Sequence, residues 1–142
     1  MPEEITPKSV TLHRESEGVY QVTTASGATL TFGRGEGLVS PVELLLAAIA
    51  GCSSIDVDAM TTRRAEPERF EVTATAEQVK NDEGNILRDI AVAFDLAFPE
   101  GEDGDKARAR IAKALEVSHE KYCTVSRTVE AGVPVALEQK QA

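Results

Sequence analysis

A long stretch of alternating residues in the second half of the chain constrains the fold most. In residues 86–98, ILRDIAVAFDLAF, apolar side chains recur at every second position from Ile90 to Phe98. Residues 70–79, FEVTATAEQV, alternate in the same way, and NDEGN between them is typical of a turn. Because strand side chains point to opposite faces in turn, the sequence predicts a long antiparallel hairpin that buries one face. That face is expected to carry Phe70, Val72, Ala74, Ala76, Ile90, Val92, Phe94, Leu96 and Phe98.

Short β-branched runs near the N-terminus predict a three-stranded meander. They cover residues 9–14, 18–24 and 28–32, with turns that contain glycine between them. The following segment, GRGEGLVS, has three glycines in five positions and is expected to form a loop. Residues 132–139, GVPVALEQ, predict a further strand that closes the fold.

Two long helices are expected. The first begins near Ser40, where Ser40, Pro41 and Glu43 form a capping box before an apolar run, and continues to about Thr62. Its expected buried face comprises Leu45, Ala48, Ile49, Cys52, Ile55 and Ala59. The second covers residues 105–122, and a shorter segment opens at Cys123. Its expected core positions are Ala107, Ile111, Ala114, Leu115 and Tyr122.

The order of these elements, βββ-α-ββ-α-(α)-β, predicts an α+β fold in one domain, residues 1–142. The net charge of −9 disfavours a nucleic-acid partner. The N-terminus lacks the basic and apolar regions of a signal peptide. The longest uncharged apolar run, residues 44–55, is shorter than the roughly 20 residues of a membrane span. We therefore expect a cytoplasmic protein with no membrane partner.

Cys52 is one of only two cysteines and lies within the most apolar stretch of the chain. Burial among apolar side chains raises the pKa of a thiol, so a packed, inert cysteine is the simplest interpretation. A reactive thiol would need a cation from elsewhere in the fold. Arg34 in GRGEG is the best candidate, because flanking glycines allow the loop to turn an arginine inward. A solvated loop arginine is the alternative.

Cys123 follows a predicted helix at a position where the next one can begin, and unpaired N–H groups at a helix start favour a thiolate. A buried cysteine at a helix junction is the alternative. His119, four residues earlier, is most simply a surface cation at a helix C-terminus. The two cysteines and two histidines lack the paired spacing of zinc sites, so no metal and no cofactor are expected.

Two cysteine-centred motifs resemble those of a known family. SPVELLLAAIAGCSSIDV resembles the first motif of the OsmC/Ohr superfamily of thiol-dependent hydroperoxide reductases: a Ser-Pro-x-Glu-Leu-Leu start, a helix of small residues and a Gly-Cys pair. YCTVSRTV resembles the second, in which a cysteine is followed by Pro or Thr, then Val and Ser. The motifs lie about seventy residues apart, and the resemblance covers essentially the whole chain.

The resemblance implies an OsmC-like fold in which antiparallel sheets pack around two long central helices in an intertwined homodimer. It implies that Cys52 attacks an organic hydroperoxide and becomes a sulfenic acid, and that Cys123 resolves it as a Cys52–Cys123 disulfide. Arg34 would stabilise the thiolate and the leaving oxygen, Glu43 would hold Arg34, and an external dithiol would reduce the disulfide. Arg127, close after Cys123, is a rival for the cation.

The residues around Cys52 also allow a second class of function. Residues nine apart in a helix are about half a turn out of phase, so Glu43 is not expected to reach Cys52 of its own helix. Nothing local to Cys52 activates it. A non-enzymatic dimeric binding module, with an interface pocket for an apolar or acyl ligand and merely packed cysteines, is therefore the alternative.

Overall fold

The computed structural model describes residues 2–140. These residues separate into two compact units, one up to Leu45 and the other from Leu46 onward. The helix that contains Cys52 crosses this boundary. The two units are described in turn, and the prediction of a single domain over residues 1–142 stays a prediction.

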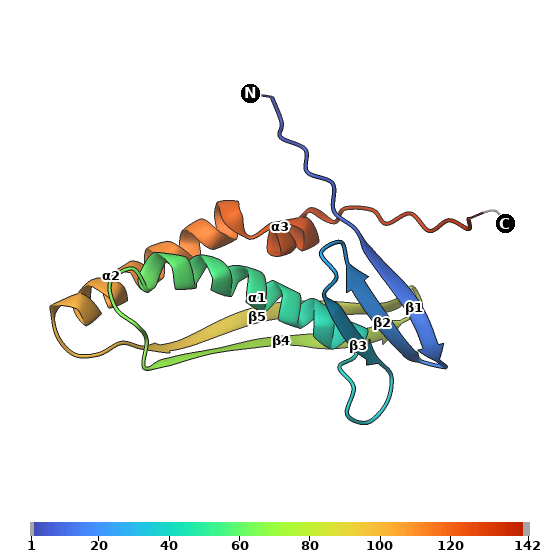
Figure 1. Ribbon diagram of the computed structural model, residues 1–142, viewed down its shortest axis with the longest axis horizontal. Coiled ribbons are helices and arrows are strands. Elements are labelled where there is room, and N and C mark those ends of the chain that lie inside the picture. The colour runs from blue at the N-terminus through green and yellow to red at the C-terminus, as the bar shows by residue number, and fades with distance from the viewer. Residues whose placement is uncertain (1, 141–142) are drawn as a thin grey trace. The chain divides into compact units, whose positions relative to one another are not determined.

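The first unit holds the predicted meander. Strands β1 (Val10–Ser16), β2 (Val19–Thr24) and β3 (Thr29–Gly33) pair antiparallel in that order (Figure 1). The β2–β3 pair needs a glycine at its end, because a Cβ on Gly33 would lie 2.0 Å from the carbonyl oxygen of Gly18. The observed strands confirm the three strands predicted for residues 9–32.

Helix α1 (Pro41–Thr61) begins where the capping box predicts. The Glu43 N–H donates to the Ser40 hydroxyl at 3.1 Å, and the Ser40 N–H donates to the Glu43 carboxylate at 2.9 Å. These two bonds satisfy backbone donors that the first helical turn leaves without carbonyl partners. The hydrogen bond from the Ser40 N–H is the largest cause that lowers the pKa of Glu43, and the interaction with the Ser40 side chain is the second.

The buried face of α1 differs from the predicted one. Ile49 is buried and Cys52 is half-buried as expected, but Ile55 is 72% exposed and Ala59 is also exposed. Leu45 and Ala48 are exposed as well. The face that is covered within the chain passes through Ile49, Ser53, Val57 and Thr61, at intervals of four. The prediction followed apolar residues alone, and here polar Ser53 and Asp56 lie on the covered side because they have hydrogen-bond partners there.

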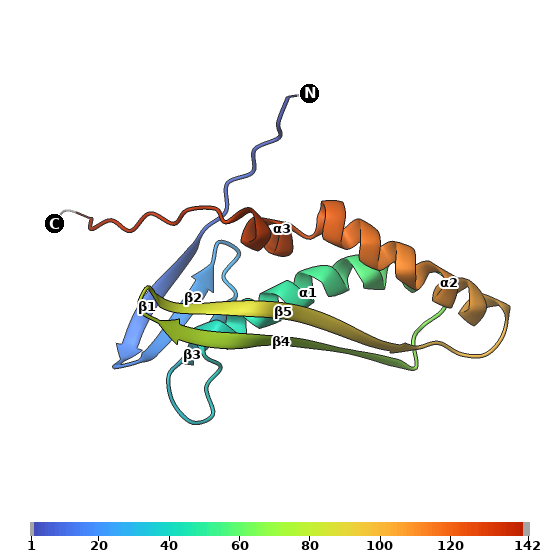
Figure 2. The same cartoon turned by 180° about the vertical axis from the view of Figure 1, so that it is seen from behind.

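Strands β4 (Arg69–Asn81) and β5 (Gly84–Ala97) form the predicted long hairpin. Every second residue from Phe70 to Ala76 and from Ile90 to Leu96 is half-buried, and Phe98 is buried, which confirms the predicted face. Asp89, with φ of 52°, occupies a bulge where the register shifts between Thr75 and Glu77. Figures 1 and 2 show α1 and α2 along the same side of this hairpin.

Helix α2 (Glu102–Val117) begins three residues earlier than predicted. It starts beside the end of β5, where a Cβ on Gly104 would lie 1.6 Å from the carbonyl oxygen of Pro99. Its core positions Ala107 and Ala114 are fully buried, and Ile111 and Leu115 are half-buried. A π-helical turn, η1 (Ser118–Tyr122), and the short helix α3 (Thr124–Ala131) follow.

Two expectations for the C-terminal part are wrong. Tyr122 is 54% exposed, because the π turn holds more residues per turn than an α-helix and so changes the direction in which residue 122 points. Residues 133–140 form no strand: their apolar side chains alternate, but no other strand of the described chain pairs with them.

Helix α1 is long and apolar enough to cross a membrane, judged by length and composition alone. The central helix of a soluble domain meets the same criterion. Its polar Ser53 and Asp56 bond to residues of η1 and the α3 cap.

Candidate functional site

The two cysteines meet at the start of α3. Cys52 lies on α1 and Cys123 is the N-cap residue of α3; both are free thiols, and Cys123 is fully buried. The two thiols lie close enough to affect each other: after burial, which is the largest influence on both, Cys123 raises the pKa of Cys52 and Cys52 lowers that of Cys123. The sequence-predicted pair of sulfurs is thus brought together within the second unit.

The π turn sets the place of Cys123. The Cys123 N–H donates to the carbonyl oxygen of Ser118 at 2.8 Å, a bond that spans five residues. Ser118 itself is 2% exposed, and its hydroxyl donates to the Asp56 carboxylate at 2.7 Å. Since Asp56 lies one turn after Cys52 on α1, this bond fixes η1 against the same helix that carries the first thiol.

The first-turn N–H groups of α3 lie close enough to the two sulfurs to lower the pKa values of the thiols. Those of Val125 and Thr124 interact with Cys52 and favour its thiolate, and that of Ser126 does the same for Cys123. The first three N–H groups of a helix have no carbonyl partner within it and carry the positive end of its dipole. The start of α3 therefore offers a polar cradle for one negative charge shared by two sulfurs.

The pKa of Cys123 is lowered overall. Burial is the largest single influence and raises it, but interactions with the Ser126 and Ser53 hydroxyls, the Ser126 N–H and Cys52 together outweigh burial. The Ser53 hydroxyl lies 3.4 Å from the Cys123 sulfur, and the Ser126 hydroxyl lies 3.1 Å from it. Cys123 is thus the better supported site for negative charge in the reduced pair.

The pKa of Cys52 is raised. Burial is again the largest cause, and the neighbouring Cys123 adds to it through a hydrogen bond and through its charge. The N–H groups of Val125 and Thr124 oppose the increase without cancelling it. This agrees with the sequence-based expectation that apolar surroundings disfavour the Cys52 thiolate.

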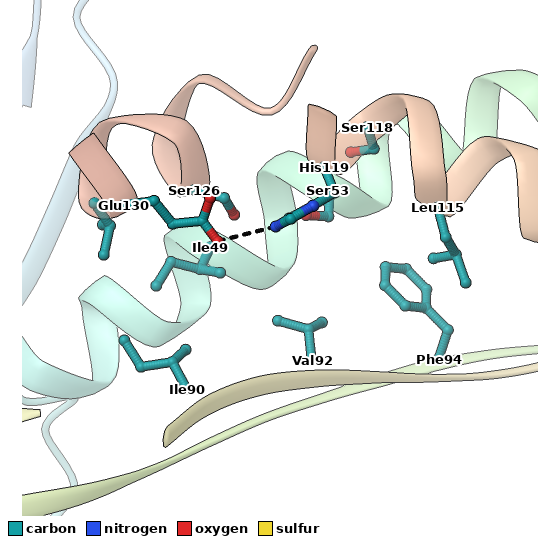
Figure 3. A pocket seen from close by; sticks show the side chains of 11 residues that line it. Ile49, Ser53, Ile90, Val92, Phe94, Leu115, Ser118, His119, Ser126 and Glu130 are labelled. Carbon is teal, nitrogen blue, oxygen red and sulfur yellow. Dashed lines mark hydrogen bonds and ion pairs between the residues drawn. The ribbon is translucent and has the colours of Figure 1, made fainter. Parts of the chain in front are cut away.

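An apolar pocket of about 320 Å³ lies beside the thiols. Its floor is formed by Ile90, Val92 and Phe94 of β5, which point toward the helices (Figure 3). Ser53 and Ser126, the two hydroxyl partners of Cys123, also line it. The remaining lining residues are Ile49, Leu115, Ser118, His119, Val129 and Glu130. The sulfur of Cys123 is therefore separated from the pocket by side chains that touch both.

An ion pair stands at the rim of this pocket. Nε2 of His119, from η1, lies 2.9 Å from a carboxylate oxygen of Glu130, from α3 (Figure 3). The hydrogen bond to Glu130, followed by its charge, raises the pKa of His119, and Cys123 contributes in the same direction. The two side chains are 64% and 61% exposed, so the pair faces solvent as well as the pocket.

Three further charged residues were predicted to serve the thiols. Arg34 is an exposed residue of the first unit, and its N–H donates to the carbonyl oxygen of Gly18. Glu43 acts as the capping residue of α1. Arg127 is exposed on α3, and its N–H donates to the carbonyl oxygen of Cys123. A role for any of these side chains at the sulfurs stays a prediction.

Sequence reasoning missed four residues of this site. Ser53 and Ser126 were passed over, and His119 was interpreted as a surface cation without its partner Glu130. Ser126 could have been found, since it lies three residues after an N-cap cysteine and is placed to face it. Ser53 and Glu130 could not, because their contacts join segments that are distant in the chain.

Known proteins are similar to this chain in sequence and in fold. The model of the OsmC-like protein family matches residues 33–138, which include parts of both units. Protein YhfA of Escherichia coli K12 is 30% identical over 102 residues, which make up 71% of this chain and 72% of YhfA. A hypothetical protein from Aquifex aeolicus has 27% identity and a TM-score of 0.70, with 89% of each chain covered.

A more distant structure has the same fold. The organic hydroperoxide resistance protein OhrB of Bacillus subtilis has 19% identity and a TM-score of 0.53, over 95% of this chain and 98% of OhrB. The mixed fold with antiparallel sheets, expected from the resemblance, is thereby confirmed. The two long helices at the centre of an intertwined homodimer stay predictions. On the family match and the identity to YhfA, the chain belongs to the OsmC-like protein family.

Proposed function

We propose that this protein is a thiol-dependent peroxidase that reduces organic hydroperoxides. The observation that carries the proposal is the proximity of Cys52 and Cys123, two free thiols from distant parts of the chain, beside an apolar pocket. The fold of an organic hydroperoxide resistance protein supports it. An apolar pocket favours an organic peroxide over hydrogen peroxide, because it offers contacts to the carbon part of the molecule.

The reaction begins with attack by a thiolate. Following the family resemblance, the Cys52 thiolate attacks the terminal peroxide oxygen, the O–O bond breaks, and the electron pair leaves with the alkoxide. Because the pKa of Cys123 is lowered and that of Cys52 is raised, the proton of Cys52 passes to Cys123 before the attack. The sulfenic acid on Cys52 then meets the Cys123 thiol, a disulfide forms, and water leaves.

Further parts of the proposal extend beyond the second unit. An external dithiol reduces the Cys52–Cys123 disulfide by exchange and restores the pair. Arg34, held by Glu43, supplies a fixed positive charge to the reacting atoms. The active form is a homodimer, which is supported by the apolar side chains that α1 leaves exposed in the single chain, Ile55 above all.

Titration of the reduced protein with cumene hydroperoxide tests the proposal. We expect the loss of two thiols per chain and a disulfide that links the peptides of Cys52 and Cys123, identified by mass spectrometry. The Cys52→Ser variant should lose peroxide consumption. The Cys123→Ser variant should stop at a sulfenic acid on Cys52, which dimedone would trap. Unchanged peroxide consumption in both single variants would refute the proposal.

The apolar pocket also supports the alternative, a binding module for an apolar or acyl ligand. The raised pKa of Cys52 agrees with a cysteine that is merely packed. The two functions differ in one measurement. A binding module would bind a fatty acid with equal affinity in the wild type and in the Cys52→Ser variant, and neither would consume peroxide.

A further inference from the structure

His119 and Glu130 lie at the pocket rim without a role in the proposed chemistry so far. They come from different elements, η1 and α3, and are the titratable side chains among the described residues that line the pocket. The other lining residues, from α1, β5, α2, η1 and α3, are apolar or carry hydroxyl groups. Outside the lining, Glu120 and Cys123 also act on His119, and both raise its pKa.

We propose that His119 is a catalytic acid of the pocket, held in place by Glu130, and that it protonates the alkoxide released when the O–O bond breaks. This inference rests on the proposed peroxidase function. An alkoxide is strongly basic and cannot leave readily without a proton. A positioned imidazolium in the wall of the substrate pocket supplies one, and general acids of this kind typically contribute about 10²–10⁴-fold to rate.

The geometry assigns separate tasks to the two ring nitrogens. A protonated imidazole donates through both Nδ1 and Nε2. Nε2 is bonded to Glu130 at 2.9 Å, which holds the ring and leaves the proton on Nδ1 as the one available for transfer. Glu130 also keeps the imidazole protonated to higher pH, because its hydrogen bond and its charge favour the imidazolium.

The step is balanced in atoms and charge. The thiolate forms the S–O bond to the terminal peroxide oxygen, which retains its hydrogen and gives the sulfenic acid. The alkoxide takes the proton from Nδ1 of His119 and leaves as the alcohol. Neutral His119 then recovers a proton from solvent, to which its side chain is largely exposed.

Two peroxides with different leaving groups test this inference. Cumene hydroperoxide releases a strongly basic alkoxide, whereas a peracid such as peracetic acid releases a weakly basic carboxylate that needs no acid catalyst. At one fixed pH, His119→Gln should slow disulfide formation with cumene hydroperoxide by about 10–100-fold and leave the peracid reaction within about twofold. His13→Gln, on β1, is the matched control and should change neither rate.

The outcomes separate the possible failures. Equal slowing of both peroxides by His119→Gln would overturn the inference, since it would indicate an effect on the thiolate or on folding. Unchanged rates with both would overturn it too. If the wild type forms no disulfide with either peroxide, the proposed function itself fails.

A pH profile with Glu130→Gln provides a second readout. On cumene hydroperoxide, the ratio of the wild-type rate to the His119→Gln rate cancels the ionisation of the thiols. This ratio should fall toward one as the pH rises through the pKa of His119. With Glu130→Gln in place of the wild type, the fall should occur at lower pH. A ratio that does not change with pH would overturn the assignment of His119 as the acid.

Discussion

The Ser53 hydroxyl donates a hydrogen bond to the sulfur of Cys123 across 3.4 Å, although the residues lie 70 positions apart in the chain. This bond joins α1 to the N-cap residue of α3. It also crosses from the lining of the pocket to a sulfur that is fully buried. The environment of the second thiol is therefore set by a side chain next to the first.

Replacing Ser53 by alanine should raise the pKa of Cys123. A hydrogen bond to a charged group contributes about 1.5–3 kcal/mol, so losing the Ser53 hydroxyl destabilises the thiolate of Cys123 relative to its thiol. The ultraviolet absorbance of the thiolate, followed against pH, measures the pKa. Ser54→Ala, one residue further along α1, is the control and should leave the titration as in the wild type. Identical curves for Ser53→Ala and wild type would contradict the role of this bond.

Replacing Ser118 by alanine should destabilise the second unit. The Ser118 hydroxyl is the 2.7 Å partner of the Asp56 carboxylate in a part-buried position, and loss of one partner costs about 1–3 kcal/mol. Urea unfolding of the reduced protein gives the change in the free energy of unfolding. A variant with wild-type stability would show that water replaces the lost hydroxyl at no cost.

Two glycine-to-alanine changes should act in opposite directions. At Gly104 a Cβ would meet the Pro99 carbonyl oxygen at 1.6 Å, so Gly104→Ala must displace backbone and should cost about 1–3 kcal/mol or more. At Gly51, within α1, a Cβ meets nothing within 4 Å, so Gly51→Ala should stabilise by up to about 1 kcal/mol. Thermal unfolding compares them. A loss of stability in Gly51→Ala would indicate that another surface covers this part of α1 in solution.

Changes at the capping box separate the structural role of Glu43 from its predicted role with Arg34. Ser40→Ala removes the side-chain acceptor and should cost about 1 kcal/mol. Glu43→Gln retains a capping side chain but removes the charge, so its stability should stay close to wild type. If Glu43 holds Arg34, Glu43→Gln should nevertheless slow thiol oxidation by cumene hydroperoxide, as Arg34→Ala should. Oxidation at the wild-type rate in both variants would exclude the pair from the site.

The ion pair of His119 and Glu130 should make stability depend on pH. Folding raises the pKa of His119 above its ordinary 6.5, through the hydrogen bond and then the charge of Glu130. Its contribution to stability is therefore complete below 6.5 and is lost as the pH rises through the raised pKa. The effect should be small, since both side chains are mainly exposed.

Urea unfolding of the wild type and of Glu130→Gln, at about pH 6 and about pH 9, measures the effect. The stability difference between the two proteins should be larger at the lower pH. A difference that increases with pH would have the wrong sign for this ion pair.

Local patterns in the sequence predicted most of the elements. The capping box of Ser40 and Glu43 fixed the start of α1, and strict alternation from Ile90 to Phe98 fixed both the strand and its buried face. The interpretation of Cys52 as a packed, inert cysteine also agrees with its raised pKa. In each case the interactions that decide the outcome lie within a few residues, so a local pattern contains them.

The wrong predictions concern features that the periodicity of apolar residues does not contain. The covered face of α1 includes Ser53 because its hydroxyl has a partner 70 residues away, and apolar periodicity cannot register such a bond. Tyr122 turned outward because of a π turn, for which the five residues from Ser118 carry no distinctive sequence pattern. Residues 133–140 alternate like a strand, yet a strand also requires a neighbour with free backbone groups, and alternation does not provide one.

The π turn has a consequence for how this site tolerates change. Deleting any one of its five residues would let an ordinary helix run on toward residue 131, with no loss of helical character. The same deletion would swing everything downstream by roughly a quarter of a revolution and carry the backbone amides of α3 away from the sulfurs. The position of Cys123 relative to α1 thus depends on the number of residues in the segment before it.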